Sequence, residues 1–114
     1  MRSQPRKQTS VALRRRRRQL LRHLPPLDRL LRGSLIERYK PCGKPGCKCA
    51  KGTGHGPKYY LSVSHYGQRP QMDYIPQDYH RQTTECLVNY HRLRKILDEV
   101  CAINHELIRR REVL

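Results

Sequence analysis

The most regular hydrophobic pattern of the chain lies in its last third, between about residue 77 and residue 111. Seam positions recur there at alternating steps of four and three, without proline or glycine, which predicts a long helix with a heptad repeat. Pro76, Gln77 and Asp78 suit the entry of this helix, since an acid is favourable near the positive end of the helix dipole. The seam comprises Tyr79, Thr83, Cys86, Tyr90, Leu93, Leu97, Val100, Asn104 and Leu107.

This predicted helix is longer than a small domain needs. About 34 helical residues extend for about 50 Å at 1.5 Å per residue, so part of the helix requires a further packing partner. We expect that part to pack on residues 20–31 of the same chain, with a homodimeric coiled coil or a partner protein as alternatives. The positions assigned to such a contact are Tyr90, Leu93, Leu97, Val100, Asn104 and Leu107, among which Asn104 suits register selection in a dimer.

A shorter, alternating pattern in the middle of the chain predicts strands. Residues 34–40, 59–64 and 69–75 carry β-branched, aromatic and polar residues in near alternation, and residues 65–68 form a turn that contains glycine. We therefore expect a three-stranded antiparallel sheet and an α+β fold.

The first 33 residues predict basic helices. Ser10 is the expected N-cap of a helix that ends near His23, and Pro25-Pro26 separates it from a short helix over residues 27–32, with Gly33 as its stop. Five adjacent arginines, residues 14–18, repel one another in the first helix, so we expect it to be marginal until phosphates neutralise it. The chain thus divides into a basic arm (1–33), a zinc-stabilised sheet (34–76) and a C-terminal helix (77–114).

A cluster of metal-ligating residues lies between the first two predicted strands. Cys42, Cys47, Cys49 and His55 have the spacing C-x4-C-x-C-x5-H, and a Cys3His set suits one structural, tetrahedral zinc without an open coordination position. Disulfides are the weaker alternative, because the cysteine number is odd and the N-terminus has no apolar segment of signal-peptide length. The sequence therefore predicts a cytoplasmic protein that binds structural Zn²⁺.

The same block carries a family resemblance. The sequence CGKPGCKCA, followed by HGPKYYLS, resembles the signature of an uncharacterised bacterial and archaeal domain-of-unknown-function family, over about residues 31–107. The chain departs from this signature at Lys58 and in the turn over residues 65–68. Members of that family often occur near transposases and other mobile-element genes, so the resemblance implies a nucleic-acid setting.

The charge of the chain points in the same direction. The net charge is +16, and residues 1–58 contain 17 Lys/Arg against two acids, whereas residues 59–114 contain 8 against 7. Such an asymmetry is typical of a surface that binds a polyanion. The residues assigned to this surface are Arg14, Arg15, Arg16, Arg17, Arg18, Arg22, Arg29, Arg32, Lys40, Lys44, Lys48, Lys51 and Lys58.

Three functions are compatible with these patterns. The leading hypothesis is a non-catalytic nucleic-acid-binding protein of a mobile-element or ribonucleoprotein complex, with structured RNA favoured over DNA. The second is an adaptor or regulator of a transposase or recombinase that acts through the C-terminal helix. The third, a metal-dependent nuclease subunit, is disfavoured because neither Asp73/Asp78 nor Asp98/Glu99 converges with a histidine or lysine. The sequence therefore predicts no catalytic residues, and no apolar run is long enough to span a membrane.

The zinc hypothesis predicts that Cys47→Ser releases the metal and unfolds the sheet, because the binding energy of a structural zinc is folding energy. Metal content by mass spectrometry and far-ultraviolet circular dichroism check this, with Cys101→Ser, remote from the block in sequence, as the control. A well-folded, metal-free Cys47→Ser protein would contradict the hypothesis.

Overall fold

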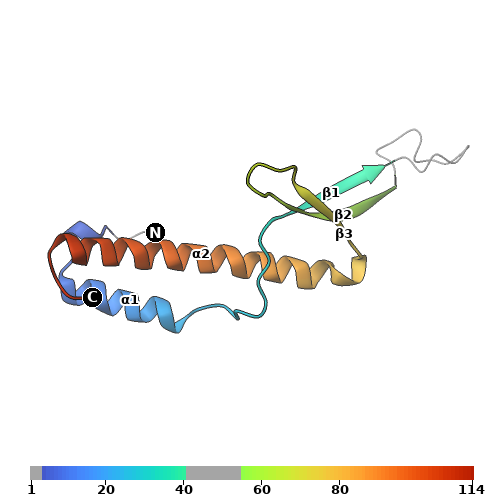
Figure 1. Ribbon diagram of the computed structural model, residues 1–114. Helices are drawn as coiled ribbons and strands as arrows, with labels where there is room; N and C mark the ends of the chain where they lie inside the picture. The colour runs from blue at the N-terminus through green and yellow to red at the C-terminus, as the bar shows by residue number, and fades with distance from the viewer. Residues whose placement is uncertain (1–3, 41–54) are drawn as a thin grey trace, which may run out of the picture. The chain divides into compact units, whose positions relative to one another are not determined.

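The structure is a computed structural model that describes residues 4–40 and 55–114. It contains a 3-10 turn η1 (Pro5–Lys7), helix α1 (Ser10–Arg22), strands β1 (Ser34–Lys40), β2 (His55–Val63) and β3 (Gln71–Ile75), a 3-10 turn η3 (Gln77–Tyr79) and helix α2 (His80–Arg109). The predicted α+β class, with an N-terminal helix, a three-stranded antiparallel sheet and a long C-terminal helix, is confirmed (Figure 1).

Contacts group these elements into two compact units that divide α2 between them. The helical unit comprises Met1–Arg29 and Asn89–Leu114, and the sheet unit comprises Leu30–Val88. The three segments predicted along the chain therefore do not coincide with the packing units, since the C-terminal part of α2 belongs with α1.

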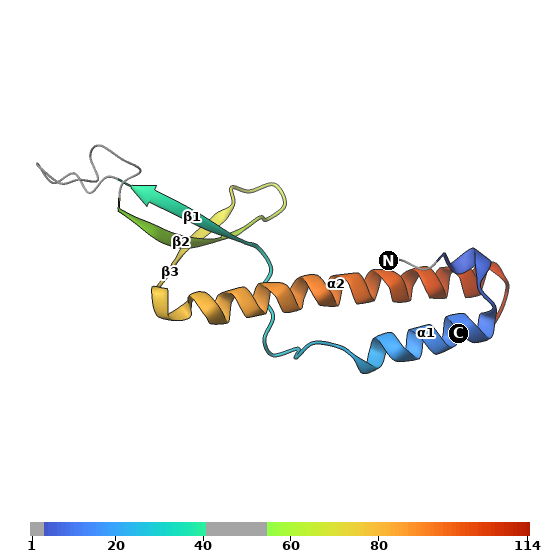
Figure 2. The same ribbon diagram turned by 180° about the vertical axis from the view of Figure 1, so that it is seen from behind.

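The helical unit is built around a small leucine and isoleucine core. α1 lies beside the C-terminal part of α2 (Figures 1 and 2), and Leu13, Leu20, Ile103 and Leu107 are buried between them. Ile96 and Val100 pack against this cluster. The four positions from α2 are spaced by four, three and four residues, so they form one stripe of the helix.

The long helix does pack within the chain, but the core contacts come from Leu13 and Leu20 of α1 rather than from the whole of the expected segment 20–31. Its seam also differs from the predicted one. Val100 and Leu107 belong to the core, whereas Leu97 is 47% exposed. The Asn104 side chain accepts a hydrogen bond of 2.6 Å from Arg17. Ile103 is buried and Ile96 packs against it on the neighbouring stripe instead, which leaves the Asn104 amide at the edge of the interface, where a charged donor satisfies it.

Capping residues define both ends of this helical pair. The N-cap of α1 is Thr9 rather than Ser10, and its hydroxyl accepts from the Ala12 backbone N–H at 3.1 Å. After α2 the chain reverses at Arg111, which has φ of 60°. The Glu112 N–H then donates to the Leu107 carbonyl and the Arg111 N–H to the Ile108 carbonyl, the pattern of a Schellman motif.

A buried carboxylate joins the end of α2 to the start of the chain. Glu106 is 5% exposed and accepts hydrogen bonds from Arg109 and Arg110. Arg110 also donates to the Ser10 hydroxyl and to the carbonyls of Pro5 and Gln8. The hydrogen bonds from Arg109 and then Arg110 lower the pKa of Glu106 to about 2.

The sheet unit places β2 between β1 and β3, and both pairings are antiparallel. Among the described residues of this unit, the buried ones are Leu61 of β2 and Thr83, Cys86 and Leu87 of α2. Tyr59 contacts His80 with ring centroids 4.2 Å apart, so the face of β2 that carries Tyr59 and Leu61 is the one that meets the first turns of α2.

The short helix predicted over residues 27–32 is wrong. The segment forms a turn at residues 27–28, and Leu27 is 61% exposed. Its backbone groups bond to α2 instead: the Leu31 N–H donates to the Cys86 carbonyl, and the Asn89 side chain donates to the Arg29 carbonyl. These partners remove the need for a local helix so soon after two prolines.

Gly33, predicted as a helix stop, has a different structural role. It adopts φ of +135°, and a Cβ at this position would lie 2.5 Å from the Ser62 carbonyl oxygen. Only glycine permits both this conformation and this close approach to β2, so Gly33 directs the chain into β1.

No helix in the described part of the chain is both long and apolar enough to cross a membrane.

The depressed pKa of Glu106 predicts an acid-labile helical unit. Its contribution to stability is complete above the ordinary pKa of 4.5 and is lost as the pH falls through the window from 4.5 to about 2. Glu106→Gln should therefore flatten the dependence of the free energy of unfolding on pH in this window, as measured by urea denaturation. Asp98→Asn, an exposed site on α2, is the control; an equal flattening there would contradict the assignment.

Candidate nucleic-acid interface

The five adjacent arginines of α1 are divided between two environments. Arg14, Arg16 and Arg17 are half-buried, whereas Arg15 and Arg18 are exposed. Leu13 and Leu20 face α2. Helical periodicity therefore brings the three half-buried arginines to the edges of that contact and turns the two exposed ones away from it. The helix was expected to be marginal without phosphates, but the fold supplies acidic and carbonyl partners instead.

Arg16 makes the most complete of these contacts. Its Nε and Nη2 donate to the two carboxylate oxygens of Glu99 at 2.6 and 3.1 Å, in the bidentate geometry that matches guanidinium to carboxylate. The hydrogen bond to Glu99 is the main cause that raises the pKa of Arg16 above its ordinary value. This pair links the middle of α1 to α2.

Arg14 and Arg17 bind the segment that follows α2. Arg14 donates to the Val113 carbonyl at 2.7 Å and pairs with Glu112 at 3.3 Å. Arg17 donates to the Leu114 carbonyl at 2.7 Å, in addition to Asn104. Glu112 also accepts from the Ser10 hydroxyl, and this hydrogen bond, followed by the charge of Arg14, lowers the pKa of its carboxyl group.

The outward arginines form a stripe along α1. Arg15, Arg18 and Arg22 are exposed and follow the spacing i, i+3, i+7, which places them on one face over about 10 Å at 1.5 Å per residue. We call these three residues the α1 stripe. Such a row of guanidinium groups suits contacts to successive phosphates of one strand.

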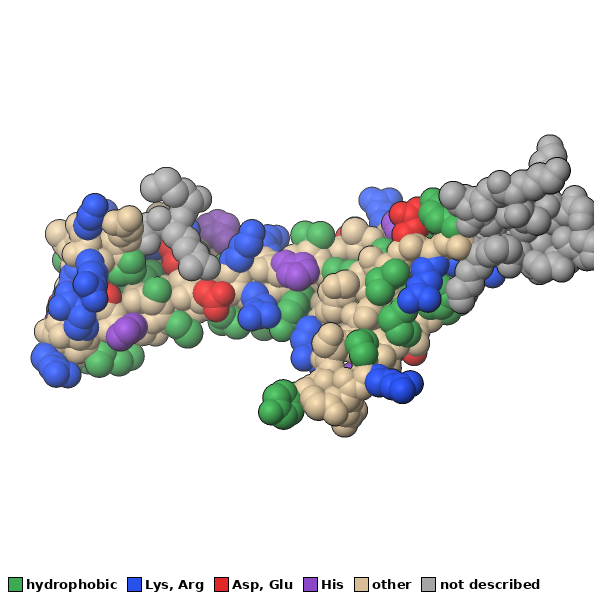
Figure 3. All heavy atoms as spheres, turned by 90° about the horizontal axis from the view of Figure 1, so that it is seen from above, with side chains coloured by type: hydrophobic (Ala, Val, Ile, Leu, Met, Phe, Trp, Pro, Cys, Tyr) green, Lys and Arg blue, Asp and Glu red, His purple; other side chains and the backbone are tan. Residues whose placement is uncertain are grey.

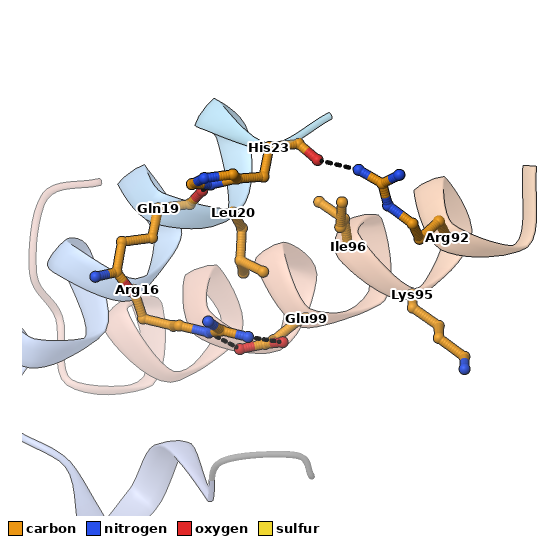
Figure 4. Close-up of a pocket in the computed structure, with 8 residues that line it drawn as sticks. All are labelled: Arg16, Gln19, Leu20, His23, Arg92, Lys95, Ile96 and Glu99. Carbon is orange, nitrogen blue, oxygen red and sulfur yellow. Dashed lines mark hydrogen bonds and ion pairs between the residues drawn. The ribbon is translucent and has the colours of Figure 1, made fainter. Parts of the chain in front are cut away.

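A basic groove lies between α1 and α2 within the helical unit. Its volume is about 500 Å³, and the side chains of Leu20 and Ile96 lie between its polar ends (Figure 4). At one end is the Arg16–Glu99 pair, and at the other the Arg92 guanidinium donates to the His23 carbonyl at 2.9 Å. The lining residues are Arg16, Gln19, Leu20, His23, Arg92, Lys95, Ile96 and Glu99.

The groove adds cations next to the α1 stripe. Lys95 and Arg92 come from α2. The His23 Nδ1 lies 2.9 Å from the Gln19 carbonyl oxygen; because a carbonyl oxygen can only accept, Nδ1 is the donor of this hydrogen bond. The helical unit as a whole remains strongly basic, with 15 Lys/Arg against 5 Asp/Glu over residues 4–29 and 89–114. In Figure 3, Lys and Arg side chains gather at the end of this unit where α1 begins and α2 ends.

The predicted contact surface is divided between the two units. Arg14 to Arg18, Arg22 and Arg29 belong to the helical unit, whereas Arg32, Lys40 and Lys58 belong to the sheet unit. Lys44, Lys48 and Lys51 lie outside the described residues, as do the proposed zinc ligands Cys42, Cys47 and Cys49.

His55 is the proposed fourth zinc ligand, and its backbone begins β2 although its side chain is not among the described ones. Strand pairing places His55 opposite Lys40, at the end of β1. The two ends of the Cys/His block are therefore attached to neighbouring strands. Among the described residues, no group of three or more His, Cys, Asp or Glu could hold a metal ion.

Sequence reasoning missed the cations that α2 contributes. Arg92 and Lys95 were counted within a nearly neutral half of the chain, whose acids pair with arginines of both helices. The available signal was the spacing of residues 92, 95 and 99, which places them on one flank of a helix. Only the position of α1 shows that this flank borders a groove.

The family described as "Domain of unknown function (DUF6788)" matches residues 11–85. The matched region includes α1, the strands and the first turns of α2, so it begins earlier and ends earlier than the resemblance over residues 31–107 implied. Comparisons with curated proteins and with solved structures found no match.

The division of the arginine run predicts unequal effects on stability. Arg16→Gln should lower the free energy of unfolding by about 1–2 kcal/mol, because it leaves the largely buried Glu99 carboxylate without its bidentate partner. Arg15→Gln, the same change one residue earlier, should leave stability unchanged in urea denaturation. Equal losses in the two variants would show that the pair does not stabilise the helical unit.

Proposed function

This chain belongs to the DUF6788 family, and we propose that it is a zinc-stabilised, basic protein that binds nucleic acid. It acts in the cytoplasm as a non-catalytic component of a mobile-element-associated or ribonucleoprotein complex, and structured RNA is favoured over DNA. The observation that carries the proposal is the α1 stripe, Arg15, Arg18 and Arg22, exposed on a helix whose other arginines are bound internally.

Internal pairing matters for binding because it determines which arginine side chains remain available to the phosphates of a polyanion. Arg14, Arg16 and Arg17 have partners within the helical unit, and an incoming phosphate would compete with those partners. The α1 stripe faces solvent, so its association with phosphates releases counterions without breaking an internal contact. The helix is already packed, which lowers the ordering cost of binding.

Two features support the zinc part of the proposal. The donor set of three thiolates and one imidazole saturates a tetrahedral site and suits a structural role. The pairing of Lys40 with His55 attaches both ends of the block to adjacent strands, which restricts the loop that a metal would close. Zinc would then present Lys44, Lys48 and Lys51 on a rigid loop as further cationic contacts.

The alternative is an adaptor of a transposase or recombinase that binds through α2. A specific observation favours it: Leu97 and Ile108 of α2 and Leu21 of α1 are each about half exposed on the helical unit. The exposed cations Arg18 and Arg94 each lie three residues before one of these apolar side chains. Charge complementarity therefore favours an amphipathic partner helix with acidic residues beside its apolar stripe. A second copy of this basic unit would instead be repelled.

The proposal predicts that replacing all three residues of the α1 stripe by glutamine weakens nucleic-acid binding and its salt dependence. With about 0.7–0.9 counterions released per phosphate contact, the loss of three contacts should reduce the magnitude of the slope of log K against log salt by about two to three. Fluorescence anisotropy measures both the affinity and its salt dependence. The probes are a structured RNA hairpin and a DNA duplex, and the salt concentration runs from about 50 to 200 mM, a range on the order of physiological ionic strength.

The matched control removes three other exposed cations of the helical unit, Arg6, Lys7 and Arg111. An equal loss in this control would show that binding follows net charge rather than the α1 stripe. If the unmodified chain binds neither probe, the nucleic-acid proposal fails and the adaptor becomes the leading function.

A further inference from the structure

The two faces of the sheet differ sharply in what they meet. Successive residues of a strand point to opposite faces, and the contact of Tyr59 with His80 identifies the face that packs on α2. Leu61 lies on that same face and is buried. The next positions along β2, Lys58 and Tyr60, therefore belong to the opposite face, which we call the open face.

Apolar and aromatic side chains occupy the centre of the open face. Ile36, Tyr60 and Tyr74 are directly paired across the three strands, and the rings of Tyr60 and Tyr74 meet edge to face with centroids 5.8 Å apart. Tyr74 is 54% exposed and Met72, one pleat away, is 38% exposed. A small sheet thus presents aromatic surface to solvent, where a β-strand of ordinary composition would present polar residues.

The charge on the open face is of one sign. Arg38 holds its guanidinium 5.8 Å from the centre of the Tyr60 ring, and it is paired across the strands with Lys58. The carboxylates of the three strands, Glu37 and Asp73, are paired with Tyr59 and Leu61 respectively and so belong to the face that meets α2.

Tyr39, also exposed, is excluded from the aromatic surface by its own contact, because its hydroxyl donates to Glu37 at 2.7 Å. In Figure 3, hydrophobic side chains lie next to Lys and Arg side chains on the sheet unit. Aromatic rings bordered by cations and free of strand carboxylates make a surface that suits a ligand with flat apolar faces and a negative backbone.

We propose that the open face of the sheet binds unpaired bases of a single-stranded nucleic acid. Bases stack on Tyr74 and beside Tyr60, and Arg38 and Lys58 contact the phosphates between them. A duplex does not offer this ligand, because its neighbouring base pairs already cover the faces of each base, whereas exposed bases stack on aromatic side chains. This inference deepens the proposed function and rests on it: the α1 stripe contacts phosphates, and the sheet selects unpaired segments.

The test compares three substitutions at exposed tyrosines, with anisotropy as the readout. The probes are a single-stranded RNA and a duplex of the same sequence. Their length is about ten nucleotides, which is on the order of one single-strand binding site. Tyr74→Leu should weaken binding of the single strand about five- to a hundredfold, the range of one lost stacking contact. Duplex binding should be unchanged.

Two variants serve as controls for this loss. Tyr74→Phe keeps the ring and should retain single-strand binding. Tyr66→Leu makes the same chemical change in the turn between β2 and β3, where the side chain is fully exposed, and should also bind normally. If circular dichroism shows that Tyr74→Leu does not fold, Arg38→Gln, which removes a cation of the same face but keeps both tyrosine rings, replaces it with the same expectation.

The outcomes separate this inference from the proposed function. Unchanged single-strand binding in Tyr74→Leu, together with a loss on replacing the α1 stripe, would overturn the sheet platform and leave the proposed function standing. Equal losses for single strand and duplex would also overturn it. No binding of either probe by the unmodified chain would overturn both.

Discussion

The ion pairs between α1 and the C-terminal part of α2 are the constraint on which the rest of the helical unit depends. A helix with five adjacent arginines is opposed by its own repulsion, and its apolar core consists of only a few aliphatic side chains. Glu99, Asn104 and Glu112 accept from Arg16, Arg17 and Arg14 at the edges of that core. Three of the five charges are thereby tied to the fold, and the helix packs without an external polyanion.

The same pairing decides which cations remain for a ligand. Because Arg15 and Arg18 point away from α2, they continue into Arg22 as a single row. The groove beside α1 adds Arg92 and Lys95 from a segment whose charge nearly balances in sequence. Internal neutralisation thus concentrates the available charge on defined surfaces, while the net charge of the unit stays high.

The two units offer different chemistry to a nucleic acid. In the proposed function, the helical unit would present guanidinium and ammonium groups that contact phosphates without reading the bases. The sheet unit presents Tyr74 and Tyr60 beside Arg38, and we propose that this combination distinguishes unpaired from paired bases by stacking. A structured RNA that contains both helical and single-stranded segments would engage both chemistries, which is consistent with the preference for RNA proposed from the sequence.

The hydrophobic and polar pattern located most elements of this protein, since local spacing fixes which face of an element is apolar. Strand β1 and the long last helix occur where the pattern predicted them, whereas β2 begins at His55, four residues before its predicted start, and β3 begins at Gln71, two residues after its predicted start. The candidate Cys/His block is likewise readable from spacing. The tertiary structure decided the rest. Residues 27–32 form no helix because α2 supplies their backbone partners. The arginine run is divided between internal ion pairs and an exposed stripe because Glu99 and Glu112, about eighty to a hundred positions away in sequence, contact one side of it. The period of a helix predicts which residues share a face, but only packing determines which neighbour that face meets.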